Sequence, residues 1–276
     1  MWCISGKYNA RVWIALVAAL ALLSSDLSAE ARSAKVETGH AKVVAHRANL
    51  DDSDQHRRVI TLPPGKTLSI EVTVGSVRIE GSDRTDAEIT IERHAPAAAH
   101  FARLPIVIDD TPARAGVRVT QLDGGTDPAL RTDVMVRVPR AAAIDRVQVL
   151  EGRISVDRFA GTLNADIRRG SIDGKDLSGT LRLESGIGSV VLTGARLSAN
   201  GLLRLRAFNG DVRLTLAERP PDARIMALAL NGTIKSDIPL TLRETWGPRW
   251  GETTIGKGEP VISLDVVTGT VEIRSP

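Results

Sequence analysis

The chain has very little cysteine. Its 276 residues include a single one, Cys3, which precedes an apolar run, whereas the acylated cysteine of a lipoprotein follows such a run. We expect cleavage after that run, which would leave no cysteine in the mature chain. Disulfide bonds, thiol catalysis and cysteine-ligated metals are then excluded.

Histidine is also scarce, and it is confined to the first part of the chain. The five histidines are His40, His46, His56, His94 and His100. Their spacing matches no zinc signature. Beyond them there is no imidazole to act as a general base, so the second half cannot assemble a Ser-His-Asp triad. We expect no metal, no cofactor and no catalytic residue.

Aromatic residues make up only 3% of the sequence, while 25% of residues are charged and the formal net charge is +3. A groove for single-stranded nucleic acid needs aromatic side chains between its basic residues, so nucleic acid is not an expected partner. The charged fraction is ordinary for a folded globular protein. Few aromatics favour thin strands that stack on aliphatic side chains.

Residues 1–29 have the pattern of a cleavable signal peptide. Lys7 and Arg11 precede an apolar run, Val12–Leu23, and small residues follow up to Ala29. The run is shorter than the roughly 20 residues that span a bilayer, although an uncleaved anchor is the alternative. We therefore expect an exported protein of the periplasm or the cell surface, with no transmembrane segment after the signal peptide.

Glycine recurs with a regular spacing in the second half. It occupies positions 152, 161, 170, 179 and 188, nine residues apart, and then 201 and 210. An apolar residue follows each glycine at the second position, and its type alternates. Ile154, Ile172, Val190 and Val212 form one series, and Leu163, Leu181 and Leu203 form the other. Apolar residues alternate singly around these positions, which indicates short strands.

This pattern predicts an all-β fold, a single-stranded β-helix (β-solenoid) with coils of about 18–22 residues. Glycine at the corners would let successive coils approach closely, and coils would stack about 4.8 Å apart. Each series should then form a ladder of stacked, buried aliphatic side chains. Because one coil cannot bury its own apolar face, the coils should stabilise one another.

Composition shifts divide the rest of the chain. We expect a polar linker over 30–56, an N-terminal β cap with early irregular coils over 57–140, and the regular β-solenoid over 141–276. A stretch rich in proline, glycine and tryptophan predicts a loop insertion over 237–259.

Three short motifs carry a family resemblance. Val136, Arg137, Val138 and Pro139 end an alternating strand, repeated Gly-x-Ile/Val units follow, and the chain closes with Gly269, Thr270, Val271, Glu272 and Ile273. Over about 57–274 this resembles the bacterial putative-adhesin domains of unknown function. The resemblance implies an exported β-solenoid without an established enzymatic role, and it brings no catalytic residues.

Two groups of residues are candidates for ligand binding. Arg182, Arg204, Arg213 and Lys235 each lie three residues after a corner glycine, so some of them could form an outward basic ladder for an anionic polysaccharide. The alternative is a solvated outer face. Trp246 and Trp250 could stack on a sugar ring or contact a partner, or they could cap the last coils.

The sequence thus predicts a non-enzymatic, structural or adhesin-like binding protein of the bacterial envelope. Its partner would be an envelope polysaccharide or an envelope protein. One alternative is a self-assembling or partner-scaffolding envelope protein. Another is a polysaccharide-active enzyme with a carboxylate pair among Asp166, Asp173, Asp176 and Glu184, although no aromatic subsites flank these residues.

Overall fold

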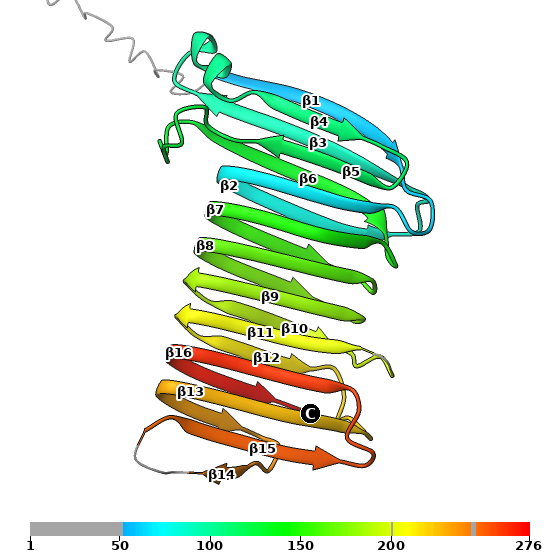
Figure 1. Cartoon of the computed structure of the whole chain (residues 1–276), viewed down its shortest axis with the longest axis vertical. Coiled ribbons are helices and arrows are strands. Elements are labelled where there is room, and N and C mark those ends of the chain that lie inside the picture. Colours follow the sequence, from blue (N-terminus) through cyan, green and yellow to red (C-terminus); the bar gives the residue numbers. More distant parts are fainter. Residues whose placement is uncertain (1–51, 200, 244–246) are drawn as a thin grey trace, which may run out of the picture. The chain divides into compact units, whose positions relative to one another are not determined.

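The computed structural model describes residues 52–199, 201–243 and 247–276 (Figure 1). Over these residues the fold is all-β, with sixteen strands and one short 3-10 helix, η1 (Ala98–Arg103). No helix in these ranges is long and apolar enough to cross a membrane. The predicted signal peptide, 1–29, lies outside the described residues, as does the predicted linker, 30–56, except for its last residues, which begin the first strand.

All sixteen strands belong to one hydrogen-bonded sheet. In chain order they are β1 (Asp52–Thr61), β2 (Thr67–Ser82), β3 (Asp86–Ala95), β4 (Ile106–Asp110), β5 (Arg114–Val119), β6 (Arg131–Pro139), β7 (Ala143–Asp157), β8 (Thr162–Lys175), β9 (Thr180–Ile187), β10 (Val190–Ala195), β11 (Leu202–Asn209), β12 (Val212–Leu216), β13 (Ala223–Ser236), β14 (Thr241–Arg243), β15 (Arg249–Ile255) and β16 (Val261–Arg274).

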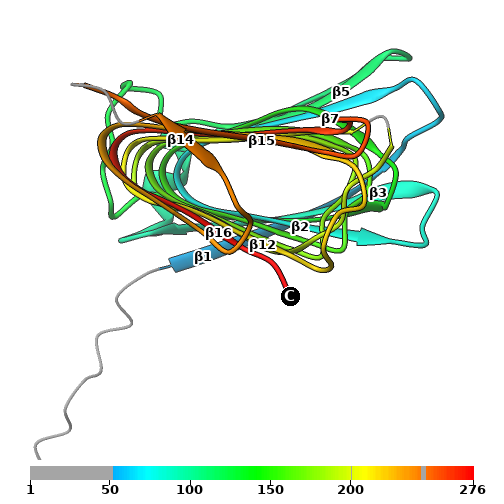
Figure 2. The same cartoon turned by 90° about the horizontal axis from the view of Figure 1, so that it is seen from below.

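The long strands bend so that the sheet has two faces around a flattened core (Figure 2). The first part of β8 pairs with β9, and after Gly170 its second part pairs with β10. Gly170 has φ +136°, and a Cβ at this position would collide with the carbonyl oxygen of Gly152 in the neighbouring strand. Only glycine allows both the bend and the close approach.

The predicted aliphatic ladders are confirmed. Ile172 lies in register with Ile154 on one side and with Val190 on the other, and Leu181 lies in register with Leu163 and Leu203. All six side chains are buried in one continuous core. Burial of each stabilises the fold by about 1.5–3 kcal/mol, so the ladders are a main source of stability.

The prediction of a single-stranded β-solenoid of 18–22-residue coils was wrong. Six strands, β8, β10, β12, β16, β11 and β9, are joined by parallel pairs into a closed ring. The last strand, β16, lies between β12 and β13 and so out of chain order. Antiparallel pairs occur at both ends of the sheet, among them β1 with β3 and β13 with β15. The glycine pattern specifies which side chains face inward, but it does not specify which strand lies next to which.

The predicted loop insertion, 237–259, also differs from the structure. It contains β14 and β15, and β15 pairs antiparallel with both β13 and β14. Because β15 continues the sheet beyond β13, this stretch covers an edge that would otherwise be open.

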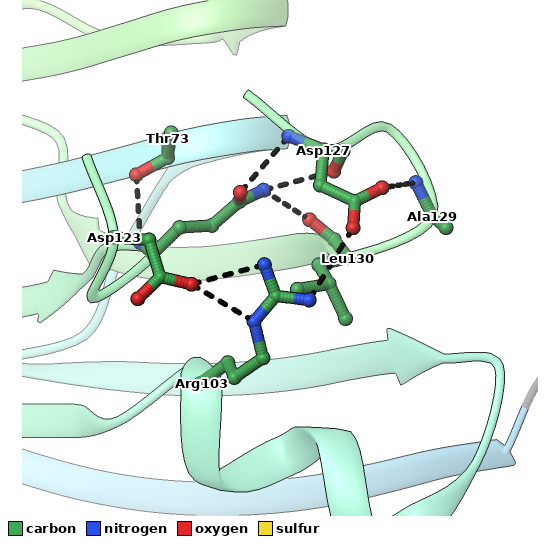
Figure 3. A network of polar contacts seen from close by, with 7 residues as sticks. Thr73, Arg103, Asp123, Asp127, Ala129 and Leu130 are labelled. Atoms are coloured by element: carbon green, nitrogen blue, oxygen red, sulfur yellow. Dashed lines mark hydrogen bonds and ion pairs between the residues drawn. The ribbon is translucent and has the colours of Figure 1, made fainter. Parts of the chain in front are cut away.

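A polar network holds the long connection between β5 and β6 (Figure 3). The side-chain amide of Gln121 donates to the carbonyl oxygens of Asp127 and Leu130, each at 2.9 Å, and its Oε1 accepts from the Asp127 backbone N–H at 2.9 Å. The Gln121 backbone N–H donates to Thr73 Oγ1 at 3.0 Å. Arg103 adds a hydrogen bond to Asp123 at 3.1 Å. Gln121 is buried, and these bonds satisfy it.

Candidate functional site

The two narrow edges of the molecule are built differently. At one edge the strands bend at single glycines such as Gly170 and Gly269, and we call this the glycine edge. At the other edge the chain enters a new strand through a turn of several residues, for example before β7, β8, β9, β13 and β16. Because these strands are parallel, their turns gather at one side, which we call the turn edge (Figure 1).

Three hollows follow one another along the turn edge. The first, about 610 Å³, lies between the segments 61–66 and 139–143. The second, about 360 Å³, is lined by Arg140, 158–160 and Arg196. The third, about 420 Å³, lies among 195–199, 218–222 and 257–260. Since each hollow shares a turn with the next, they form one interrupted groove, the turn-edge trough, and each section has the size of a small-ligand site.

The middle section of the trough is rich in arginine. Arg140 Nε lies 3.1 Å from Asp83 Oδ1, and Arg158 pairs with Glu80, while Arg196 is exposed at the rim. These ion pairs restrict the first two guanidinium groups without burying them. The section therefore offers the N–H donors of three arginines beside one lining carboxylate, Asp176. Guanidinium groups suit carboxylate or phosphate ligands.

The backbone is strained at this section. Among the residues that the structure describes, Arg158 and Asp176 are the two non-glycine residues with positive φ, each at 52°. Their positions are equivalent, since the preceding residues, Asp157 and Lys175, are in register. A left-handed backbone costs a non-glycine residue about 1–2 kcal/mol, and such strain tends to occur at functional sites.

The two outer sections differ in chemistry. The first has walls of proline and alanine, and its half-buried Lys66 has its Nζ 2.5 Å from Asp110 Oδ1. The third has apolar walls that include Leu197 and an acidic rim that includes Asp222, whose Oδ1 accepts from the Lys257 backbone N–H at 2.7 Å. The trough therefore changes from apolar through basic to acidic along its length.

The residues that line the trough in the described ranges supply binding groups, namely arginines, carboxylates and apolar walls. They include no histidine or cysteine. The described part of the chain also holds no cluster of three His, Cys, Asp or Glu residues that could ligate a metal ion.

The predicted basic ladder does not form as one row. Arg182 and Arg204 are in register on β9 and β11, on one face of the molecule. Arg213 of β12 and Lys235 of β13 lie on the other face, separated by Glu272 of β16. Each of the four residues lies three positions after a corner glycine. Gly179 and Gly201 lie at the turn edge and lead into strands on one face, whereas Gly210 and Gly232 lie at the glycine edge and lead into strands on the opposite face.

Acidic residues also lie next to the pair on the first face. Arg204 Nε lies 3.9 Å from Asp265 Oδ2, and Glu184 lies in register with Asp166. Asp166 is exposed at the surface, but partial desolvation by its neighbours raises its pKa, and the adjacent Glu184 raises it further. Burial likewise raises the pKa of Asp265, against the effect of Arg204. This face carries mixed charge, as the solvated-face alternative predicts.

The tryptophan pair is only half described. Trp250 lies on β15, half-buried, opposite Leu228 of β13 and Arg243 of β14. Trp246 lies outside the described residues, so a role for the two together stays a prediction.

Sequence reasoning missed the trough. Arg158 and Asp176 are 18 residues apart, which is the spacing of the glycine pattern, and this periodicity could have marked them as equivalent corner residues. Nothing comparable marks Arg196 or the prolines of the first section. The turns that carry these residues differ in length and composition, so they show no common sequence pattern. The hollows between the turns are visible only in the assembled fold.

No protein-family model matches the chain, and no curated protein matches its sequence. Several solved structures show a distant similarity. A "putative cell adhesion protein" from Clostridium sporogenes is 12% identical with a TM-score of 0.44, over 82% of this chain and 100% of that chain. A "putative adhesin" from Bacteroides fragilis is 14% identical with a TM-score of 0.40, over 80% and 97%. A "putative lipid binding protein" from Parabacteroides distasonis is 9% identical with a TM-score of 0.26, over 80% and 96%. The first two names agree with the resemblance stated from the sequence.

Proposed function

We propose that the chain is an exported, non-enzymatic binding protein of the bacterial envelope, and that the turn-edge trough holds its ligand. The observation that carries this proposal is the alignment of three hollows along one edge. Export rests on the signal-peptide pattern of residues 1–29.

The ligand that best fits the trough is an extended anionic polymer, such as an acidic envelope polysaccharide. Neighbouring turns repeat at the strand spacing of about 4.8 Å, so successive units of an extended chain could contact successive turns. In the middle section, the guanidinium groups of Arg140, Arg158 and Arg196 would bind its carboxylates or phosphates. Carboxylates at the rim of the third section would accept hydrogen bonds from its hydroxyl groups.

Titration calorimetry with purified acidic polysaccharides tests this proposal. Arg196→Gln removes an exposed trough arginine, and we expect it to weaken binding at least tenfold. Arg206→Gln is the matched control, because Arg206 is an exposed arginine on the flat face of β11 and belongs to neither candidate group. Equal losses in the two variants would contradict a site in the trough. Release of new reducing ends during incubation would contradict the non-enzymatic role.

Strand β1 favours a second candidate function, self-assembly. The path of paired strands ends at β1, so one edge of this strand is unpaired within the described residues. Asp52 and Asp54 lie in its first half and Arg57 and Arg58 in its second half. In an antiparallel pair of two β1 strands, each acidic half would face a basic half. Arg58→Glu should then abolish any concentration-dependent dimer seen by sedimentation velocity, whereas a parent chain that stays monomeric throughout would refute this candidate.

A further inference from the structure

A small pit lies on the outer face of the sheet, where β5 pairs with β4 on one side and with β2 on the other (Figure 1). Ala115, Val117 and Val119 of β5 are buried in the core, so Gly116 faces outward. Because Gly116 has no side chain, a hollow of about 150 Å³ remains above it, which we call the Gly116 pit. An engineered cavity of about this volume takes up benzene, so the pit has room for one small molecule.

Four charged side chains form the walls of the pit, and their charges cancel. Arg114 and Arg118 stand at its two ends, each two residues from Gly116 on the same strand. Asp109 of β4 lies in register with Gly116 on one side, and Glu71 of β2 stands on the other side. The pit therefore presents two guanidinium groups and two carboxylates within a few ångströms of one floor.

The two arginines keep free N–H donors. Arg118 Nε lies 2.9 Å from Glu71 Oε2, and Arg114 Nη2 lies 3.6 Å from Asp145 Oδ2. Each guanidinium group has five N–H bonds, and both side chains are about half exposed, so donors remain for a ligand. Arg146, just outside the pit, also pairs with Glu71, at 3.4 Å. Arg146 and Asp145 cancel each other, so the rim adds no net charge to the pit.

The acid opposite the arginines is free to bind. Asp109 is exposed and, unlike its neighbour Asp110, which pairs with Lys66, belongs to none of the ion pairs of the described residues. Ser69 is buried at the floor, and its hydroxyl group makes one long hydrogen bond, 3.4 Å, to the Ala115 carbonyl oxygen. A carboxylate and a hydroxyl group with spare bonding capacity thus face the two arginines across the pit.

We propose that the Gly116 pit binds a compact zwitterion of the α-amino acid class. Such a molecule carries a carboxylate and an ammonium group on one carbon atom. Its carboxylate would accept hydrogen bonds from Arg114 and Arg118, while its ammonium group would donate to Asp109. A simple anion would be repelled by the carboxylates of the pit, and a simple cation would be repelled by its arginines. An uncharged molecule would displace water from charged walls without a charge of its own.

Nuclear magnetic resonance of the full chain, labelled with nitrogen-15 glycine, reads the pit at its floor. The Gly116→Thr variant identifies the Gly116 amide signal, because that signal disappears. The labelled chain is titrated separately with L-alanine, D-alanine, acetate, methylammonium and glucose. We expect one or both alanines to move the Gly116 signal in a saturable manner, and the other three compounds to leave it in place at the same concentrations.

Substitutions in the walls locate the two charges of the ligand. Asp109→Asn and Arg114→Gln should each raise the alanine concentration for the half-maximal shift at least fivefold. Arg206→Gln should leave it unchanged, because Arg206 is an exposed arginine on β11, on the same face of the sheet but outside the pit. The other glycine signals report whether each variant is folded.

The outcomes that would overturn the proposal are distinct. A Gly116 signal that no compound moves would exclude the site. Acetate or methylammonium as effective as alanine would exclude a zwitterion site, and so would a response to glucose alone. Equal losses in Asp109→Asn and Arg206→Gln would exclude a role for the walls. The pit shares no lining residue with the turn-edge trough, so loss of polysaccharide binding in Arg196→Gln bears on the trough alone.

Discussion

Replacement of Ile172 by aspartate tests the aliphatic ladder directly. Ile172 is fully buried between Ile154 and Val190, which are its register neighbours on β7 and β10. The substitution loses the burial of an isoleucine side chain, about 1.5–3 kcal/mol. It also places a carboxyl group among aliphatic side chains, where burial without a hydrogen-bond partner costs several kcal/mol more. The sum, about 5 kcal/mol or more, is comparable with the whole stability of many domains.

Urea denaturation followed by circular dichroism measures this effect. Thr193→Asp is the matched control, because Thr193 is exposed on β10 and lies in register with Lys175. We expect the control to stay within about 0.5 kcal/mol of the parent chain. The Ile172→Asp variant should regain some stability at acidic pH, because a neutral carboxyl group is cheaper to bury. Equal unfolding midpoints for the two variants at pH 7 would refute the assignment of the inward face.

Three further predictions concern other parts of the sheet. Gly170→Ala should destabilise by about 3 kcal/mol in the same assay, because its Cβ meets the Gly152 carbonyl and its φ is +136°; an unchanged midpoint would contradict the close approach. Gln121→Leu should cost about 2–4 kcal/mol, since it leaves buried backbone groups of the β5/β6 connection without partners; hydrogen exchange there should accelerate. Asp166→Asn should stabilise by less than about 1 kcal/mol at pH 7. The pKa of Asp166 is raised in the folded state, so ionisation of this residue lowers the stability of the fold. Asn carries no charge and avoids this loss at pH 7. The stability difference between the two chains should therefore vanish as the pH falls through the folded-state pKa of Asp166.

The sequence was informative about the inside of the fold. Alternating apolar residues after each glycine predicted which side chains are buried, and the register of Ile154, Ile172 and Val190 confirms it. The prediction of buried side chains is correct because burial here depends on local geometry. Side chains alternate between the two faces of a strand, and a corner glycine fixes where the alternation starts. Both are visible in a short stretch of sequence.

The order of the strands was not predictable in the same way. Val271 of β16 lies in register with Val212 of β12 on one side and with Ile234 of β13 on the other. Val and Ile ladders are nearly interchangeable in packing, so the pattern alone cannot decide whether β13 or β16 lies beside β12. In the structure β15 pairs with one side of β13 and β16 pairs with the other, so β16 lies between β12 and β13.

The candidate sites were not predictable for the same reason, because they depend on strand order and not on the local sequence pattern. The basic residues that sequence spacing grouped together, such as Arg204 and Arg213, lie on different faces, where acids such as Asp265 and Glu272 neighbour them. The trough depends on which turns become neighbours. It is therefore a product of strand order, the feature that the local pattern leaves open.

The contrast between the two edges also explains why binding groups gather at the turn edge. A glycine bend is fixed on both sides, since the backbones of Gly152 and Gly170 approach too closely for any side chain at the bend. A turn such as 217–222 is less restricted, because Glu218 and Arg219 are exposed, although Pro220 is buried. Exposed turn residues can therefore change their charge at little cost to the core, whereas closed glycines cannot change, and the turn edge has such glycines too, for example Gly161 and Gly179. Ligand specificity can vary at the turn edge while the ladder, and with it the fold, stays the same.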